Sequence, residues 1–313
     1  METVTAAYVP TDEDFRLKSN AGEIGIDTNF ASQNFWKDVL IRFFKKKSAV
    51  IGLIFIVLIT VMVIIGPGMT PYTYSEQNLS QKNLAPRVAS LEKLGIFDGS
   101  ESISTTSGSK KMNYYVEKGL DNVYYWFGSD NFGRDIWTRT WSGAKVSLII
   151  AVAAALIDMI IGMSYGLISG YFGGKVDLIM MRIVDIIYSL PDMLIIILLS
   201  VVFNETLKPL ITGTVLEKLG TNMISMFIVF GLLYWVGMAR LIRGQILSIK
   251  ENEFVLAARS IGAKPGWIIR KHILPNCLSV IIVSTALQIP SAIFTESYLS
   301  FIGLGVNAPM PSL

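Results

Sequence analysis

The feature that most constrains this chain is a set of apolar runs, each long enough to cross a lipid bilayer. The runs cover about residues 48–65, 146–168, 178–203, 223–241 and 278–302. A helix rises about 1.5 Å per residue, so roughly 18 residues cross the hydrocarbon core. Of the 313 residues, 52% are hydrophobic and only 16% are charged, which is too apolar for an ordinary soluble domain. The sequence therefore predicts an all-α transmembrane protein with five visible spans.

Basic residues outside the runs indicate how the chain is oriented in the membrane. Arg42 and the lysines at 45–47 lie directly before the first run, and by the positive-inside rule they keep the amino terminus in the cytoplasm. We therefore expect a multi-pass protein of the cell membrane, in contact with lipid. Its predicted parts are a cytoplasmic tail at 1–47, a first span at 48–66, an extracellular loop at 67–143 and a membrane core at 144–313. The formal net charge of +3 does not point to a nucleic acid partner.

Residue counts exclude much chemistry from this chain. Cys277 is the only cysteine and His272 the only histidine, so an intrachain disulfide, a thiolate cluster and a histidine-based metal site are all excluded. The sequence contains no Gly-x-x-x-x-Gly-Lys-Ser/Thr phosphate loop, and by that route it neither binds nor hydrolyses ATP. We predict a protein that is not an enzyme, with no catalytic residue, metal site or cofactor of its own.

The stretch ENEFVLAARSIGAKPGWIIRKHILP, residues 251–275, differs from the apolar runs because it is basic and amphipathic. The Lys-Pro-Gly turn at 264–266 divides it into two predicted short helices. On the first helix Phe254, Ala258 and Ile261 share one face, where a small residue lets a second protein approach closely. The pattern predicts a docking surface on the cytoplasmic side. An amphipathic linker is the alternative.

This stretch resembles the EAA loop of binding-protein-dependent ABC import permeases. The family pattern has two alanines, three residues, a glycine, nine residues, then an apolar residue, any residue and Leu-Pro. The residues that match in register are Ala257, Ala258, Gly262, Leu274 and Pro275. The chain departs from the pattern at Leu256, where the family has an acid, and at His272, where it has an apolar residue.

Other motifs resemble the peptide and nickel branch of the same family. Glu253 with the AAR and HILPN sequences matches that branch, as do FGSDNFGRDIWTRTWSGAKVSL at 127–148 and the stretch at 170–198. ESYLSFIGLGVNAPMPS resembles the exit from the branch's fifth span. The resemblance covers the chain from about Trp126 onward. It is closest to the second permease, or C subunit, of oligopeptide and dipeptide importers.

The resemblance implies the fold and the partners of a type I ABC importer permease. A sixth span is then expected by family, although the given sequence shows five. The implied partners are a homologous second permease subunit, two ATP-binding cassette ATPase subunits that bind ATP and Mg, and an extracellular solute-binding protein. The implied coupling loop comprises Glu253, Phe254, Ala257, Ala258, Arg259, Gly262, His272, Leu274 and Pro275.

The resemblance also leaves the cargo open. Oligopeptides or dipeptides are the favoured cargo, and nickel or another small solute is the alternative. A secondary transporter is a third reading, which we favour less because the sequence shows no internal repeat with broken helices.

Small and charged residues inside the runs indicate contacts within the bilayer. Gly162, Gly166 and Gly170 recur at four-residue spacing, which suits close helix packing in lipid. A charge at membrane depth costs several kcal/mol unless it is paired or wetted. On that ground Asp158 and Glu296 are predicted to face the translocation path or a neighbouring subunit.

Two further features concern individual helices. Arg182 and Asp185 are three residues apart near a cytoplasmic end, which predicts an ion pair within one helix. Pro191 and Pro290 each remove a backbone donor, and both are expected to interrupt their helices.

Overall fold

The computed structural model describes residues 35–105, 108–306 and 310–312. The chain divides into two compact units, Met1–Leu58 and Ile59–Leu313. The described part of the first unit contains α1 (Phe35–Lys45) and the first part of α2 (Lys47–Ile65). The predicted cytoplasmic tail covers residues 1–47, and its first part, residues 1–34, lies outside the described residues.

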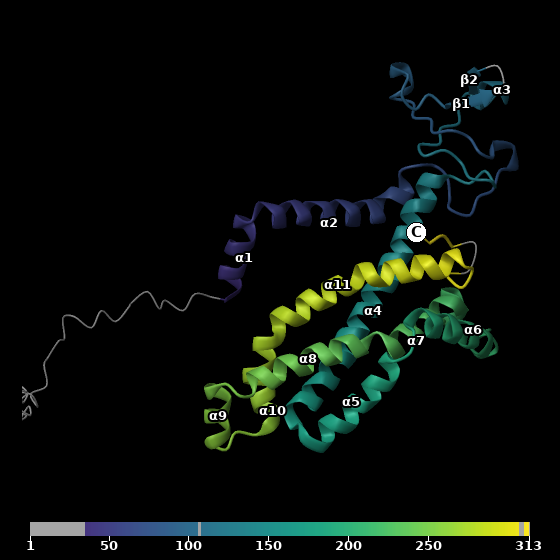
Figure 1. Ribbon diagram of the computed structural model, residues 1–313. Coiled ribbons are helices and arrows are strands. Elements are labelled where there is room, and N and C mark those ends of the chain that lie inside the picture. The colour runs from purple at the N-terminus through teal and green to yellow at the C-terminus, as the bar shows by residue number, and fades with distance from the viewer. Residues whose placement is uncertain (1–34, 106–107, 307–309, 313) are drawn as a thin grey trace, which may run out of the picture. The chain divides into compact units, whose positions relative to one another are not determined.

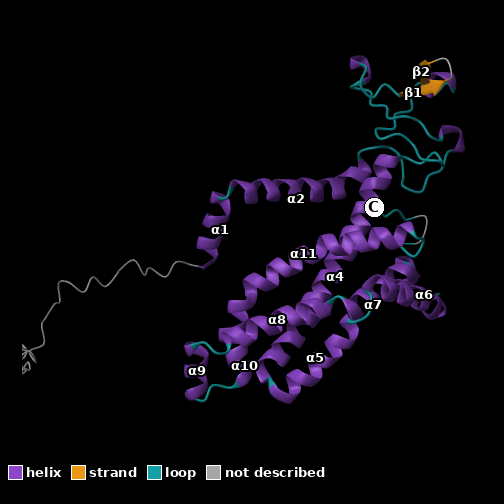
Figure 2. Ribbon diagram, in the orientation of Figure 1, coloured by secondary structure: helices purple, strands orange, loops and turns teal. Residues whose placement is uncertain are grey.

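The second unit is mostly helical, and its strands form one small antiparallel hairpin, with Ser100 opposite Asn113 (Figures 1 and 2). Its elements after α2, in chain order, are the 3₁₀ helices η1 (Gly66–Gly68), η2 (Leu79–Gln81) and η3 (Glu92–Leu94), strands β1 (Ser100–Thr105) and β2 (Gly108–Asn113), helices α3 (Tyr114–Glu117), α4 (Ile136–Phe172), α5 (Gly174–Tyr188) and α6 (Asp192–Ile211), the 3₁₀ helix η4 (Val215–Leu219), helices α7 (Thr221–Leu233), α8 (Trp235–Ile249), α9 (Glu253–Ser260) and α10 (Pro265–Ile268), the π-helical turn η5 (Ile269–Ile273), and α11 (Leu274–Phe301).

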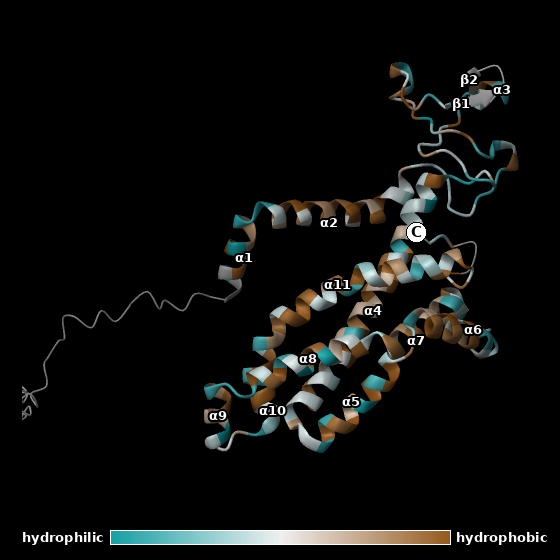
Figure 3. Ribbon diagram, in the orientation of Figure 1, coloured by the Kyte–Doolittle hydropathy of each residue, from teal (hydrophilic) through white to brown (hydrophobic). Residues whose placement is uncertain are grey.

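Five helical segments among the described residues are long and apolar enough to cross a membrane, as the sequence predicts. They are Lys47–Gly68, Ile136–Phe172, Asp192–Ile211, Thr221–Ile249 and Pro265–Phe301. Figure 3 shows the apolar residues concentrated along these helices and the polar ones in the connections. The second segment begins at Ile136, before the predicted start near 146, because the Asp135 carboxylate caps the backbone N–H groups of Trp137 and Thr138.

The predicted third span, 178–203, differs from the structure in its bounds, whereas the predicted interruption at Pro191 is confirmed. The structure divides it into α5 and α6, with Ser189, Leu190 and Pro191 between them. Proline lacks the N–H that a helix interior uses, and it disfavours helical geometry in the residue before it. The chain therefore leaves the helix before Pro191, and the membrane-length helix begins at Asp192.

At Pro290 the helix is not broken as predicted, because α11 continues through the proline to Phe301. At its other end, α11 is joined through η5 to α10 without a loop. The second predicted short helix of the 251–275 stretch is therefore continuous with the last span. The membrane-length segment begins at Pro265 and not near 278.

Helix α4 organises the second unit. It packs most extensively against α8 and α11 and also contacts α5 and α7. At its middle, Ile150, Ala151 and Ala154 join a buried cluster with residues of α6, α7 and α11. At its far end, Leu167 and Tyr171 join a second cluster with α8, α9 and α11. Figure 1 shows α9 and α10 at one end of this bundle and β1 and β2 beyond the other.

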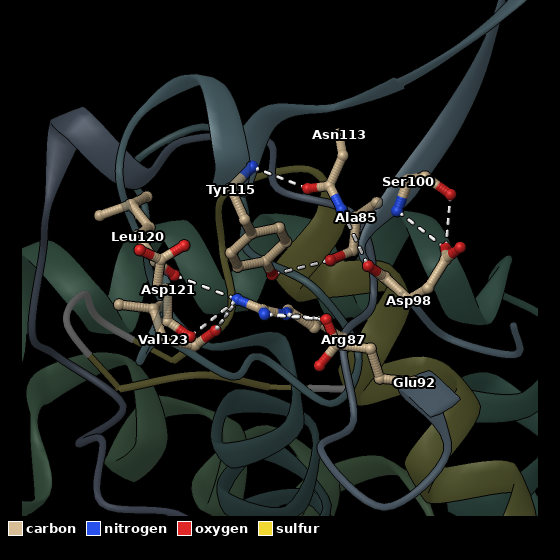
Figure 4. A network of polar contacts seen from close by, with 10 residues as sticks. All are labelled: Ala85, Arg87, Glu92, Asp98, Ser100, Asn113, Tyr115, Leu120, Asp121 and Val123. Carbon is tan, nitrogen blue, oxygen red and sulfur yellow. Dashed lines mark hydrogen bonds and ion pairs between the residues drawn. The ribbon is translucent and has the colours of Figure 1, made fainter. Parts of the chain in front are cut away.

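The residues between the first two spans form a small subdomain, residues 66–135, which we call the polar subdomain. Its core is aromatic: Tyr115 and Tyr125 are buried with Leu84, and Tyr72 packs against them. Arg87 is buried beside this core (Figure 4). The predicted loop is thus an ordered subdomain with a core of its own.

The Arg87 guanidinium holds the polar subdomain together from inside. Its Nη1 donates to the backbone carbonyl oxygens of Leu120, Asp121 and Val123 at 3.1, 3.2 and 3.4 Å. Its Nη2 pairs with Glu92 at 2.9 Å. The Tyr115 ring lies 5.1 Å from the guanidinium carbon, a distance at which a cation and an aromatic face attract.

Candidate functional site

The segment at residues 251–275 forms a helix, a turn and a short helix at one end of the bundle. Helix α9 ends at Ser260, and Gly262, two residues later, has a φ of +80°, a left-handed conformation that glycine adopts without steric penalty. The N–H of Ala263 donates to Ala258 and that of Gly262 to Arg259, at 3.1 and 2.9 Å. This pair of bonds is a Schellman motif, which terminates a helix by satisfying its last carbonyls.

The second half of the segment begins at Lys264 and Pro265. Pro265 occupies the first turn of α10, where its missing N–H costs nothing and its fixed φ favours a helix. The chain then passes through η5, where one extra residue widens the turn before Leu274 and Pro275 begin α11. This short helix is thereby continuous with a membrane-length helix.

The inner side of the 251–275 segment is fixed to the bundle. Val255, Ala258, Ile268 and Ile273 are buried in one cluster with α4 and α8. The face predicted for docking therefore does not point outward as a whole. Ala258, one of its three residues, is 5% exposed and packs inward against the bundle.

The outer side carries large apolar side chains that face outward. Ile261 is 83% exposed, and Phe254, Leu256 and Trp267 are each exposed by two fifths or more. The His272 ring lies 5.0 Å from Trp267 and 6.0 Å from Phe254, so it is packed among them. Several exposed large apolar side chains in one short segment, held on a fixed frame, favour a protein interaction site.

The other predicted residues of this segment lie on its surface or at its edge. Glu253, Ala257, Arg259, Gly262 and Pro275 are exposed, and His272 and Leu274 are partly buried. The Arg259 guanidinium lies 5.4 Å from the Tyr171 ring of α4, which ties α9 to the bundle.

Ion pairs next to the segment join α4, α5 and α8. The Arg243 guanidinium donates to both carboxylate oxygens of Asp177, at 2.7 and 2.6 Å, and the Ser169 hydroxyl donates to the same carboxylate at 2.5 Å. The hydrogen bonds from Arg243 lower the pKa of Asp177 below its ordinary value. Lys250 donates to the backbone oxygen of Gly170 at 3.2 Å.

The predicted ion pair between Arg182 and Asp185 is wrong. Asp185 instead pairs with Arg240 on α8. The guanidinium of Arg240 also lies 4.1 Å from the Tyr188 ring. Because α5 packs beside α8, Arg240 on α8 reaches the Asp185 carboxylate in place of Arg182, which lies one turn away on α5.

The three glycines at four-residue spacing lie where α4 meets α8. A β-carbon on Gly162 would lie 2.7 Å from the backbone oxygen of Trp235, and one on Gly166 would lie 2.6 Å from that of Ala239. At Gly170 it would lie 3.0 Å from the β-carbon of Ile246. These distances are shorter than van der Waals contact, so the two backbones approach as closely as they do only because side chains are absent.

The two acidic residues predicted at a path or subunit contact are buried within the chain. Asp158 is 3% exposed, and Glu296 is 0% exposed. The hydroxyls of Ser147 and Ser300 donate to Glu296 at 2.5 and 2.8 Å. Both carboxylates are therefore enclosed by this chain's own helices, and their role at the translocation path or a subunit contact stays a prediction.

The sequence analysis missed two features. The polar subdomain's core gives no periodic signal, because its tyrosines are spread over fifty residues. The polar side chains that gather around Asp192 were also missed: the sequence marks Asp192 as a charge beside an apolar run, but it does not bring Tyr234 or Gln288 next to it.

Comparison with known proteins places the chain among membrane permeases. Residues 162–313 match the family described as "Binding-protein-dependent transport system inner membrane component". Residues 34–86 match the family described as "N-terminal TM domain of oligopeptide transport permease C".

Individual relatives agree with these matches over most of the chain. The dipeptide transport system permease protein DppC of Bacillus subtilis is 38% identical over 301 residues, 96% of this chain and 78% of that protein. The oligopeptide transport system permease protein OppC of the same organism is 39% identical, covering 90% of this chain and 75% of that protein. OppC of Escherichia coli K12 is 35% identical, covering 90% and 76%.

Proposed function

This chain belongs to the family of inner-membrane components of binding-protein-dependent transport systems, and from that premise we propose that it carries peptides across the membrane as half of an importer. Its relatives of 35 to 39% identity are named for dipeptide and oligopeptide transport. The match to a family named for oligopeptide permease C supports the same cargo. The chain itself is a multi-pass membrane permease.

The partners follow from the same proposal. We propose that a homologous second permease completes the translocation path and that an extracellular binding protein delivers the peptide. Two separate ATPase subunits bind ATP with Mg and supply the free energy. This chain contributes the element whose position responds to them.

The observation that carries the coupling role is the outward apolar face of the 251–275 segment. Phe254, Ile261 and Trp267 are exposed while the inner side of the same segment is fixed in the bundle core. An ATPase that covers this face would move α10, and α10 continues through η5 into α11. Nucleotide-driven closure of the ATPases would thereby reach a membrane-spanning helix.

The orientation is part of the proposal. Basic residues gather around the 251–275 segment, which by the positive-inside rule favours the cytoplasm for that end. They are Arg240, Arg243, Lys250, Arg259, Lys264, Arg270 and Lys271. The polar subdomain then faces outward, where a binding protein approaches, and the amino terminus lies inside.

The test is purification and reconstitution of the natural complex. We expect the chain to copurify with a second permease and with ATPase subunits. Proteoliposomes that hold the complex should take up a tripeptide only with ATP and the binding protein. Uptake by this chain alone, driven by an ion gradient and without any ATPase, would instead make it a secondary transporter.

Orientation is tested separately by cysteine labelling in intact cells. A cysteine at Ser80 in the polar subdomain should react with a membrane-impermeant maleimide, and one at Lys264 should not. Both side chains are at least partly exposed, so the contrast reports the side of the membrane. Labelling at position 264 from outside would reverse the assignment.

A further inference from the structure

A cavity of about 210 Å³ lies where the break between α5 and α6 meets α7, α8 and α11. Its lining combines apolar side chains with five polar ones from four separate parts of the chain. The polar residues are Tyr188, Asp192, Tyr234, Gln288 and Ser291. This group is separate from the 251–275 segment.

The cavity lies beside the middle of the membrane-length segment Thr221–Ile249, in which Tyr234 stands. Tyr234 lines it, and the backbone oxygen of the next residue, Trp235, faces Gly162 of α4 at the distance given above. Gly162 lies inside the apolar stretch of α4, with Ile160 and Ile161 exposed next to it. A carboxylate at this depth costs several kcal/mol against lipid, so its surroundings must supply water or a cation.

No cation of the described residues pairs with Asp192. Its side chain is exposed, and among the described residues no hydrogen bond or ion pair reaches its carboxylate. Arg240 lies over the ring of Tyr188, another residue of the cavity wall, but its guanidinium is held by Asp185. The cavity therefore presents an anionic group and hydrogen-bonding side chains, and leaves a place for a cation from outside the chain.

We propose that Asp192 receives the ammonium group at the amino end of a peptide cargo as it passes through the membrane. This inference rests on the proposed function, because only then does an ammonium-bearing cargo reach the bilayer interior. Gln288 and Ser291 stand on the same wall and offer acceptors for the remaining N–H groups of that end. The volume suits one end of a peptide, so the same site serves cargoes of different lengths.

The test uses the complete importer in proteoliposomes with its binding protein and tri-alanine, whose only cation is its amino end. Asp192→Asn keeps the shape of the side chain and removes its charge. We expect its maximal uptake to fall about tenfold or more, equivalent to about 1.4 kcal/mol. Asp192→Glu should retain most of the uptake. Glu205→Gln, an exposed carboxylate on the same helix α6 outside the cavity, should leave it unchanged.

The outcomes separate this inference from the proposed function. If the unmodified importer does not take up tri-alanine, the peptide function fails. If the unmodified importer and Asp192→Asn take it up at the same rate, the assignment of Asp192 fails while the function stands. Binding of tri-alanine to the isolated binding protein is unaffected by either variant, since that protein is a separate polypeptide.

A second measurement covers the case in which Asp192→Asn fails to assemble. In a Cys277→Ser background, Asp192→Cys should react with a water-soluble cationic thiosulfonate reagent, and tri-alanine turnover should slow the reaction. A cysteine that does not react would place position 192 against lipid or a neighbouring subunit and overturn the proposal. Reaction at a rate independent of tri-alanine would overturn it as well.

Discussion

The regions at the two ends of α4 differ in how completely they bury their own side chains. The polar subdomain encloses its own groups: Tyr115 is buried, and Arg87 meets carbonyl oxygens and Glu92 inside it. The 251–275 segment buries one side only and leaves Ile261 and Trp267 exposed. A region that satisfies its own groups is stable by itself, whereas an exposed apolar face is complete only with a partner. We infer that substitutions at the first end act on stability and those at the second on coupling.

The largest expected effect comes from substituting two glycines in left-handed conformations, one in each region. Gly133 in the polar subdomain has φ of +71°, and a β-carbon there would lie 1.7 Å from the backbone oxygen of Asn78. Gly133→Ala adds both a left-handed penalty and a backbone clash, which together cost about 2 to 5 kcal/mol. We expect the polar subdomain to become sensitive to limited proteolysis while the bundle stays intact.

Gly262→Ala is the matched control at the other end. Its φ is +80°, but no atom lies within 4 Å of the position of the added carbon. The expected loss is only the left-handed penalty, about 1 to 2 kcal/mol. If thermal unfolding shows the same loss of stability for both variants, the two regions do not differ in how tightly they are packed around these glycines.

Gly262→Arg gives the second largest effect, and it concerns transport. The arginine stem extends from the open side of the 251–275 segment and obstructs any protein that covers it. Coupling free energies of about 1 to 3 kcal/mol correspond to a fall of about 5-fold to 150-fold in ATP-dependent uptake. Gly262→Ala separates backbone strain from bulk, and Lys264→Arg tests added length in the same turn. Uptake that equals the unmodified protein's, with the ATPases still bound, would show that this face has no coupling role.

The 251–275 segment could be predicted because its information is local. Two alanines, Gly262 and the Leu274-Pro275 pair specify helix ends and turns within twenty-five residues, where spacing alone decides the geometry. What the sequence could not provide was the side that faces inward. Ala258 is buried because α4 and α8 lie beneath it, and those helices are distant in sequence.

The membrane helices were predictable in number and less so in continuity. Apolar length predicted five spans, but the effects of the two prolines depend on context. At Pro191 the chain leaves the helix, whereas at Pro290 the rest of α11 holds the helix together across the missing bond. The Asp192 cavity could not be predicted, since its wall comes from segments a hundred residues apart.

A third, smaller effect is expected from the ion pairs beside the 251–275 segment. Asp177→Asn leaves the Arg243 guanidinium without its carboxylate, and a hydrogen bond to a charged group contributes about 1.5 kcal/mol or more. Thermal unfolding of the purified complex measures the loss. Asp185→Asn is the control: that side chain is 50% exposed against 15% for Asp177, so water replaces more of its pairing. A larger loss from Asp185→Asn would contradict the ranking by burial.

The smallest effect is expected from acid at the edge of the polar subdomain. Lys111 lies 2.7 Å from the Asp98 carboxylate, and its hydrogen bond together with that of Ser100 lowers the pKa of Asp98 well below its usual value. A carboxyl group with a lowered folded pKa stabilises the fold above its unfolded pKa of about 3.9 and loses that contribution as the pH falls further. Between pH 8 and 5 the hairpin should therefore keep a constant stability.

Below about pH 4 the hairpin of β1 and β2 should open more often, but by less than about 1 kcal/mol, because the pair is exposed to water. The Lys111 side chain is 60% exposed, in contrast to the buried Arg87 nearby. Amide exchange of Ser100 to Asn113, corrected for intrinsic rates, measures the opening at each pH. Lys111→Met should remove part of the pH dependence, leaving the part due to Ser100. Loss of protection already between pH 8 and 6 would mean that another group controls the hairpin, since the pKa of Asp98 is far below that range.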